Sequence, residues 1–199
     1  MSDRITTEAP KILEDFTKLP DFNKLKGHGG SFLVVPLDQY KVFSKEQFTD
    51  DQKMFANAAL EYAVNRMKPV KEELKNLNKE LTLEIIKELG EMGFLGVDIP
   101  EEYGGSDLDK TTAAIVVDYL AFSECSSMMV TLGAHSGIGT LPLIWYGTEE
   151  QKKKYLPKIT SGESLACYAL TEPNAGSDAM NGESTAYLNN EKTHYILNG

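Results

Sequence analysis

The feature that most constrains the fold is a change of pattern after Gly162. From Phe48 onward, apolar residues recur at the spacing of one face of an α-helix. Two capping boxes, Thr49–Gln52 and Thr148–Gln151, each place a threonine three residues before a glutamine, and they predict helix starts. After Gly162, short apolar runs alternate with turn residues, which is typical of strands. We expect a mainly α fold that leads into the start of an antiparallel β-domain.

The helical part should contain roughly four to six helices. Residues 81–92 form one amphipathic helix that stops at Gly93, and residues 94–105, with their Gly and Pro, form a loop. Residues 109–124 and 128–145 are apolar on nearly every side. We therefore expect both of these helical stretches to be buried.

Strands are predicted at residues 165–170, 185–188 and 194–197, with a turn at Asn189–Asn190 between the last two. Three short strands leave open sheet edges, so we expect an unfinished β unit. The predicted domains are an N-terminal arm at 1–45, a helical domain at 46–163 and the beginning of a β-domain at 164–199.

Charge and cysteine content exclude several classes of function. The 199 residues include 20 Lys and Arg against 30 Asp and Glu, a net charge of −10. We therefore expect no nucleic-acid partner, and any phosphate group must be bound by local N–H groups or hydroxyls. Cys125 and Cys167 lie far apart and match no metal-binding or disulfide pattern, so we expect no metal and a reducing compartment.

The sequence shows neither the pattern of a secretory signal nor that of a membrane-spanning segment. Residues 1–20 lack the continuous apolar core of a secretory signal. No apolar run approaches the roughly 18 residues that span a bilayer. We expect a soluble, cytoplasmic protein with no integral membrane segment.

The most distinctive stretch is Tyr168–Asp178, hereafter the 168–178 loop. A predicted strand leads into a turn rich in Pro, Asn, Gly and Ser. Gly176 permits close approach to the backbone, Thr171 and Ser177 supply hydroxyls, and successive N–H groups in such a loop bind anions. A flat heterocycle with a phosphate tail would suit this loop and the aromatic Tyr168. Considered alone, these residues favour the simpler alternative of a surface loop between strands.

Glycines within a predicted helix are the second unusual feature. Gly133, Gly137 and Gly139 interrupt the helical stretch 128–145, where each glycine costs about 1 kcal/mol relative to alanine. They indicate either close helix–helix contact or a ligand against the backbone. We interpret His135, which lies among them, as a structural residue rather than a catalytic one.

The 168–178 loop resembles the first signature of the acyl-CoA dehydrogenase family. Other stretches are similar to family landmarks in the same order, and the resemblance covers about residues 46–199. Three shorter stretches are similar to the very-long-chain branch of the family, namely Gly30–Leu33, Gly133–His135 and Ile138–Gly139. The landmarks themselves are Phe94–Gly96, Ile99–Gly105, Gly147–Lys152, Tyr155–Pro157 and Ser161–Glu163.

The resemblance implies an N-terminal helical bundle plus an incomplete β-barrel, with FAD bound at the loop. It implies that the Leu170 backbone lies near the pyrimidine edge and that Thr171 binds near flavin N5. It also implies that Gly176 and Ser177 bind the pyrophosphate and that Ser177 touches the acyl-CoA. Asn174 departs from the small residue of many relatives. The residues implied to line FAD are Tyr168, Ala169, Leu170, Thr171, Glu172, Pro173, Asn174, Ala175, Gly176 and Ser177.

The implied reaction is α,β-dehydrogenation of a fatty acyl-CoA. A carboxylate base takes the α-proton while the β-hydrogen moves as hydride to flavin N5, and electrons then pass to an electron-transferring flavoprotein. The family places that base in a C-terminal helical bundle, so we expect it beyond Gly199 and do not assign it to Glu172. Without that part, we expect this chain to be inactive and to bind FAD weakly or not at all. Gly137 and Gly139 would leave room for the acyl chain.

Other functions remain open at this point. An acyl-CoA oxidase or a flavin monooxygenase shares the fold but uses oxygen. A non-catalytic helical interaction module without flavin is an alternative of another class. For a complete enzyme, the resemblance implies a homo-oligomer, either dimer or tetramer.

Overall fold

The computed structural model describes residues 43–199 of the protein. The chain divides into two units after Phe48, and the second unit, residues 49–199, is described by itself below. In the described end of the first unit, the 3₁₀-helix η2 (Lys45–Gln47) lies between two phenylalanines, Phe43 and Phe48. Their rings stack with centroids 5.6 Å apart.

The predicted arm at 1–45 lies almost entirely outside the described residues. This includes Gly30–Leu33, which carried part of the finer resemblance. The boundary expected between residues 163 and 164 stays a prediction, because residues 49–199 form one compact unit.

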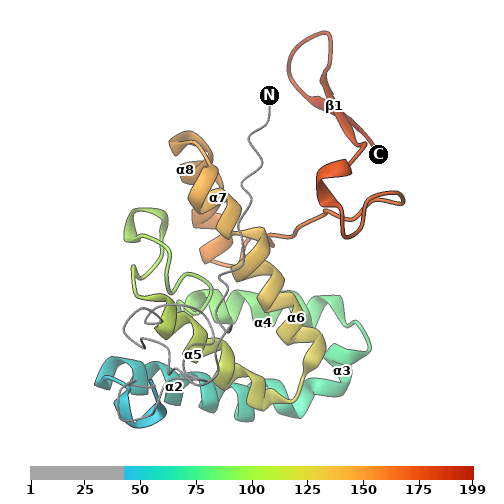
Figure 1. The fold of residues 1–199 in the computed structure, drawn as a ribbon. Helices are drawn as coiled ribbons and strands as arrows, with labels where there is room; N and C mark the ends of the chain where they lie inside the picture. The colour runs from blue at the N-terminus through green and yellow to red at the C-terminus, as the bar shows by residue number, and fades with distance from the viewer. Residues whose placement is uncertain (1–42) are drawn as a thin grey trace, which may run out of the picture. The chain divides into compact units, whose positions relative to one another are not determined.

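Helices dominate the second unit, and one antiparallel hairpin follows them (Figure 1). The hairpin consists of β1 (Thr185–Leu188) and β2 (Tyr195–Asn198). Two π-helical turns, η3 (Ala63–Met67) and η7 (Ala134–Gly139), extend α-helices. The α-helices are α2 (Asp50–Tyr62), α3 (Lys71–Lys75), α4 (Lys79–Glu91), α5 (Lys110–Leu120), α6 (Ser126–Gly133), α7 (Leu141–Tyr146) and α8 (Glu149–Thr160). The 3₁₀-helices are η4 (Lys68–Val70), η5 (Glu101–Tyr103), η6 (Ala121–Ser123) and η8 (Ala179–Asn181).

Both predicted capping boxes are present. The Thr49 hydroxyl accepts the Gln52 N–H at 3.2 Å, and the Gln52 side chain accepts the Thr49 N–H at 3.1 Å. Thr148 and Gln151 repeat this exchange at 3.3 and 2.9 Å. These bonds satisfy N–H groups that have no partner within a helix, so they start α2 and α8 where the sequence predicts.

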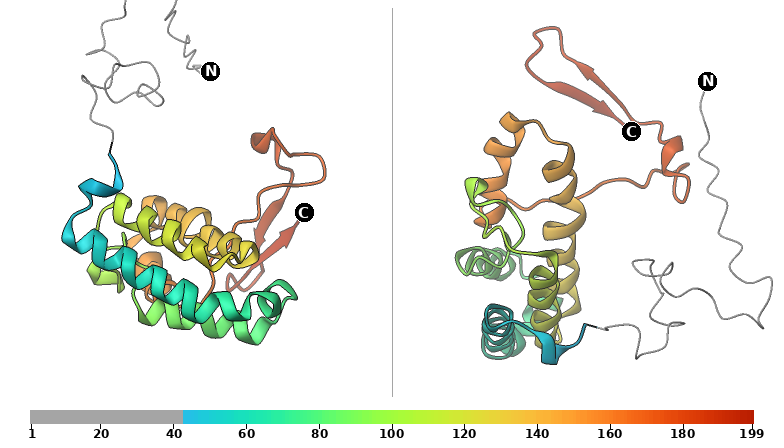
Figure 2. Two further views of the ribbon diagram at one scale, coloured as in Figure 1. Left: turned by 90° about the horizontal axis from the view of Figure 1, so that it is seen from below. Right: turned by 60° about the vertical axis from the view of Figure 1, so that its left-hand side comes forward.

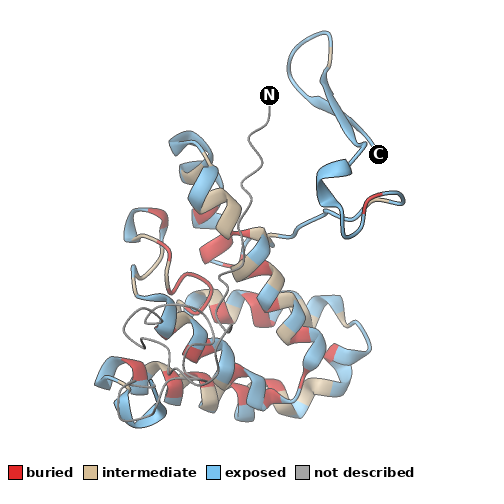
Figure 3. Cartoon of the chain, viewed as in Figure 1, coloured by how far each residue is buried: buried red, intermediate tan, exposed pale blue. Residues whose placement is uncertain are grey.

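The helices gather into one bundle around an apolar core (Figure 2). Helix α2 packs against α5, and each helix turns one side inward (Figure 3). The expectation that residues 109–124 and 128–145 are buried on all sides is wrong. Val117 is 38% exposed and Val130 73%, because each helix covers the described core with one face only. The largest fully buried core side chains include Met67, Ile85, Ile86, Leu89, Val116, Met128 and Leu132.

A second apolar cluster lies between the loop 94–105 and α8. Its buried members are Ile99, Tyr103, Leu156 and Ile159. The loop folds back on itself at Gly105, where a Cβ would lie 1.9 Å from the Ile99 carbonyl oxygen. Only glycine permits this contact, so the loop predicted from Gly and Pro residues is a compact, closed structure.

The chain after α8 differs from the predicted three strands. Residues 165–170 are not a strand, because no neighbouring segment of the described chain forms a ladder with them. The other two strands are confirmed, with Thr185 paired to Asn198 and Leu188 to Tyr195. Their connection is wider than a two-residue turn, since the Asn189 side chain accepts the N–H groups of Thr193 and His194.

No helix within 43–199 is long and apolar enough to cross a bilayer. The same residues contain no cluster of three or more His, Cys, Asp or Glu that could hold a metal ion.

Candidate functional site

The 168–178 loop closes into a tight turn at its tip. The Glu172 N–H donates to the Ala175 carbonyl at 3.0 Å, and the Ala175 N–H donates to the Glu172 carbonyl at 3.1 Å. Pro173 and Asn174 form the tip between these two residues. The paired bonds bring Thr171 and Gly176 to the same end of the turn, one on each side.

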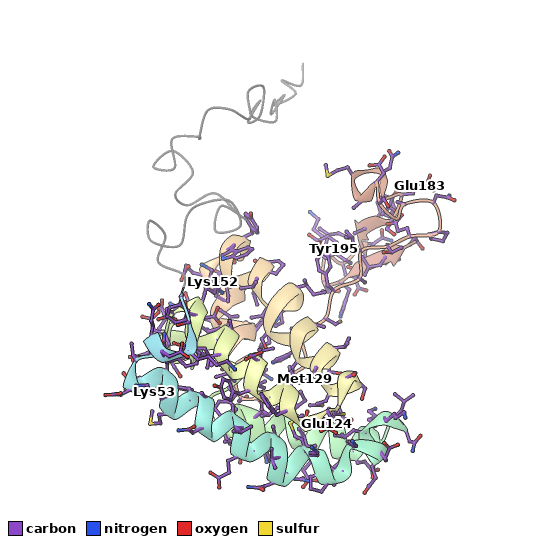
Figure 4. The ribbon with its side chains drawn as sticks, turned by 60° about the horizontal axis from the view of Figure 1, so that its bottom comes forward. Lys53, Glu124, Met129, Lys152, Glu183 and Tyr195 are labelled. Carbon is purple, nitrogen blue, oxygen red and sulfur yellow. The ribbon has the colours of Figure 1, made fainter. Side chains whose placement is uncertain are left out.

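The Glu172 carboxylate holds this turn to the segment before β1. It accepts the Glu183 N–H at 2.6 Å and the Ser184 N–H at 3.2 Å. Glu183, labelled in Figure 4, also accepts a bond of 3.4 Å from the Asn174 amide. The hydrogen bonds from Ser184 and Glu183 hold the pKa of Glu172 below its usual range. The carboxylate is therefore engaged by backbone groups and serves as an anchor.

The groups expected to bind a ligand face solvent. Thr171, Gly176 and Ser177 are exposed, and Tyr168 and Leu170 are 51% and 47% exposed. Within residues 43–199, the two hydroxyls and the Gly176 and Ser177 N–H groups make no hydrogen bond. A Cβ on Gly176 would meet no atom within 4 Å. Free donors in the same loop as the aromatic Tyr168 fit a ligand with phosphates and a flat ring.

Two residues of η7 hold the chain that leads into this loop. The Ala166 N–H donates to His135 Nδ1 at 3.1 Å, and His135 Nε2 lies 3.1 Å from the Ile159 carbonyl oxygen. A Cβ on Gly139 would lie 2.7 Å from the Ala166 carbonyl carbon and 2.8 Å from the Cys167 nitrogen. The structure thus places backbone in the space that the sequence prediction reserved for an acyl chain at Gly139.

Gly137 lies elsewhere, on a groove of about 510 Å³ between α5 and α6. We call it the α5–α6 groove. A Cβ on Gly133 or Gly137 would meet no atom within 4 Å, so both glycines leave space there. The lining includes none of the residues 168–177, and Lys110 and Asp98 form an ion pair at it. Its apolar lining includes Phe94, Val97, Ala113, Val117 and Leu132.

Sequence reasoning missed how the loop is fixed at both ends. The sequence places Glu172 among the residues implied to line FAD and Ala166 within a predicted strand. No local pattern signals either role, because the partners lie 11 residues away for Glu172 and 31 for His135. The structural interpretation of His135 agrees with its complete burial between two backbone groups.

A second contact joins the closed loop 94–105 to α8. The Tyr103 hydroxyl donates to the Glu149 carboxylate at 2.7 Å. This bond raises the pKa of Tyr103 to about 12 and lowers the pKa of Glu149. The helical unit therefore presents η7, α8 and the loop 94–105 as one connected support for residues 164–167.

Comparisons with known proteins show to which family the helical unit is similar. The model of the family described as acyl-CoA dehydrogenase, N-terminal domain, matches residues 49–163. The "Probable acyl-CoA dehydrogenase" of Bacillus subtilis (strain 168) is 44% identical over 171 residues, covering 86% of this chain and 28% of that protein. The mitochondrial very long-chain specific acyl-CoA dehydrogenase of Macaca fascicularis is 36% identical over 168 residues, covering 78% and 26%.

A solved structure of a similar protein has the same fold as this chain. The crystal structure of an acyl-CoA dehydrogenase complexed with FAD from Bacillus anthracis has a TM-score of 0.76 and 48% identity. The match covers 86% of this chain and 29% of that one, so this chain spans less than a third of these relatives. The matched helical domain and the similarity in sequence and fold show that the chain belongs to the acyl-CoA dehydrogenase family.

Proposed function

We propose that the protein containing this chain is an FAD-dependent acyl-CoA dehydrogenase that acts on fatty acyl-CoA thioesters and passes electrons to an electron-transferring flavoprotein. The observation that carries the proposal is the exposed 168–178 loop, with free donors at Thr171, Gly176 and Ser177. FAD, when bound, supplies the acceptor for the hydride from the substrate β-carbon.

The residues of the loop would bind and orient the cofactor. Thr171 would donate to the flavin ring, and the Leu170 backbone would lie along its pyrimidine edge. Gly176 and Ser177 would donate to the pyrophosphate, where N–H and hydroxyl groups to a charged acceptor form strong hydrogen bonds. Glu172 would hold the loop in shape, and its two backbone bonds support that role over that of a catalytic base.

The α5–α6 groove is our candidate for part of the acyl-chain site. It is lined mainly by apolar side chains, and Gly133 and Gly137 leave its wall open. Ser177 would contact the thioester end of the same substrate. Gly139 stays a predicted substrate contact with weaker support, since backbone occupies the space beside it.

Cofactor binding is tested by titrating the complete enzyme with FAD and following flavin fluorescence. Ser177→Ala removes one donor to a charged group, so we expect FAD affinity to fall roughly tenfold or more. Thr171→Ala should alter the flavin absorption spectrum as well, because its hydroxyl is proposed to bind the ring. Thr111→Ala, at an exposed threonine of α5, is the control. Equal FAD affinity in all three variants would count against the proposed site.

Substrate binding is tested with a chain-length series of acyl-CoA thioesters in the complete enzyme. Gly137→Leu places a side chain into the α5–α6 groove, so we expect the preferred acyl chain to become shorter. Ile138→Leu changes the next residue, which is 58% exposed and is not part of the groove lining. An unchanged length preference in Gly137→Leu would remove the groove from the proposal.

Compartment and assembly belong to the same proposal. Both cysteines are free, Cys125 buried and Cys167 exposed, which suits a reducing cytoplasm. We also propose a dimer or tetramer for the complete enzyme. Cell fractionation and sedimentation velocity test these two statements separately.

A further inference from the structure

His135 joins three elements from a fully buried position. It belongs to η7, and its side chain is 0% exposed. One ring nitrogen lies 3.1 Å from the carbonyl oxygen of Ile159 in the last turn of α8. The other lies 3.1 Å from the N–H of Ala166, two residues before the 168–178 loop.

The two contacts determine the form of the ring. A backbone N–H can only donate, so Nδ1 must accept from Ala166 and carries no proton. Nε2 therefore carries the proton and donates to the Ile159 carbonyl. Burial lowers the pKa of His135, which favours this neutral form.

The bond to Ala166 is the last one before the loop. Ser164 donates to the Lys158 carbonyl at 2.9 Å, and Ala166 then donates to His135. Within the described chain, no hydrogen bond joins residues 167–171 to the helices. Gly139 lets the backbone of Ala166 and Cys167 lie against η7 at the same place. The direction in which the loop leaves the helical unit therefore depends on this contact.

We infer that His135 is a positioning residue for the flavin site, because its Nδ1 atom fixes Ala166 and so sets where the 168–178 loop begins. The inference rests on the proposed function of that loop. A side chain of similar size that only fills space would leave the Ala166 N–H without its partner. The acceptor at Nδ1, rather than the volume of the ring, is what the site requires.

Three variants separate the acceptor from the volume. His135→Asn keeps an oxygen near the position of Nδ1, and His135→Gln keeps an amide N–H near the position of Nε2. His135→Leu keeps neither. The readout is hydrogen exchange of the Ala166 amide, whose N–H donates to His135, compared with the amides of α2 and α5 in the same full chain.

We expect His135→Asn to retain wild-type exchange at the Ala166 amide. His135→Gln and His135→Leu should exchange roughly three- to tenfold faster there, with α2 and α5 unchanged. Equal exchange in the Asn and Gln variants would overturn the inference, whether both match wild type or both are faster. If the leucine variant does not fold, the Asn and Gln pair still decides the question.

Two further measurements keep this test apart from the proposed function. Nitrogen NMR of histidine-labelled wild-type chain should give an unprotonated Nδ1 for His135, and a protonated Nδ1 would contradict the inference. FAD titration of the complete enzyme should then give roughly tenfold weaker binding for His135→Gln than for His135→Asn. If the complete wild-type enzyme binds no FAD while the exchange pattern holds, the proposed cofactor fails and the role of His135 in fixing Ala166 stands.

Discussion

At the scale of single residues, Gly133 and Gly139 lie on the same helical run and have opposite surroundings. A Cβ on Gly139 would meet the backbone of Ala166 and Cys167 at 2.7 and 2.8 Å, and backbone cannot move aside cheaply. A Cβ on Gly133 would meet no atom within 4 Å, and its φ of −63° is helical. The same residue type therefore serves close packing at one position and open space at the other.

This difference predicts opposite effects of alanine on stability. Gly139→Ala should lower the free energy of unfolding by about 1–3 kcal/mol through overpacking. Gly133→Ala should raise it by about 0.5–1 kcal/mol, because alanine favours the helix. Urea denaturation of both variants measures the two changes, and a shift of the same sign in both would contradict this account of the packing.

At the scale of elements, the two capping boxes explain where α2 and α8 begin. Thr148 matters most for the site, since α8 carries the Ile159 carbonyl that His135 contacts. Helix α8 is otherwise polar on its outer side, with Lys152 paired to Glu149 at 3.2 Å. Such exposed pairs contribute little, so the cap and the buried Leu156 and Ile159 hold the helix in place.

Thr148→Ala should therefore lower the free energy of unfolding by about 1 kcal/mol. Thr148→Ser keeps the hydroxyl and is the matched control, which should remain close to wild type. Thermal unfolding followed by circular dichroism compares the three proteins. A loss in the serine variant as large as that in the alanine variant would show that the cap bond is not the cause.

At the scale of the whole molecule, the dependence of stability on pH is set more by the positions of particular carboxylates than by the net negative charge. Arg66 donates to Glu88 at 2.8 Å and holds the pKa of Glu88 low. Lys68 and Lys71 lower the pKa of Glu124 to about 2. The folded chain therefore binds fewer protons in acid than the unfolded chain, so the stabilisation from these carboxylates is lost as the pH falls below about 4.5.

Protonation of His135 also lowers the stability of the folded chain, and it does so at a higher pH than protonation of the carboxylates. Its pKa is lowered in the folded chain, so protonation favours the unfolded chain once the pH falls below about 6.5. We expect the free energy of unfolding to fall between pH 7 and pH 5.5, where the carboxylates stay ionised, and His135→Asn to remove that fall. Urea unfolding at both pH values measures it, and a wild-type stability that rises in acid would contradict the assignment.

Much of the fold could be predicted because its signals are local. A capping box spans four residues, and the helical periodicity around it spans about 11–18. Residues 165–170 show the limit, since they have the composition of a strand but a strand also needs a neighbour to bond with. Val130 shows a second limit of prediction from the sequence, because apolar character does not determine which face of a helix meets the core.

Some features of the candidate site could likewise be predicted from the sequence, and others could not. The amino-acid order of the 168–178 loop was sufficient for its hydroxyls, its glycine and its family resemblance to be identified from the sequence. Only the tertiary structure decided that Glu172 is an anchor, that Gly139 receives backbone and that His135 holds Ala166. Local chemistry depends on neighbours along the chain, whereas these three roles depend on groups that the folded bundle brings together from up to 31 residues away.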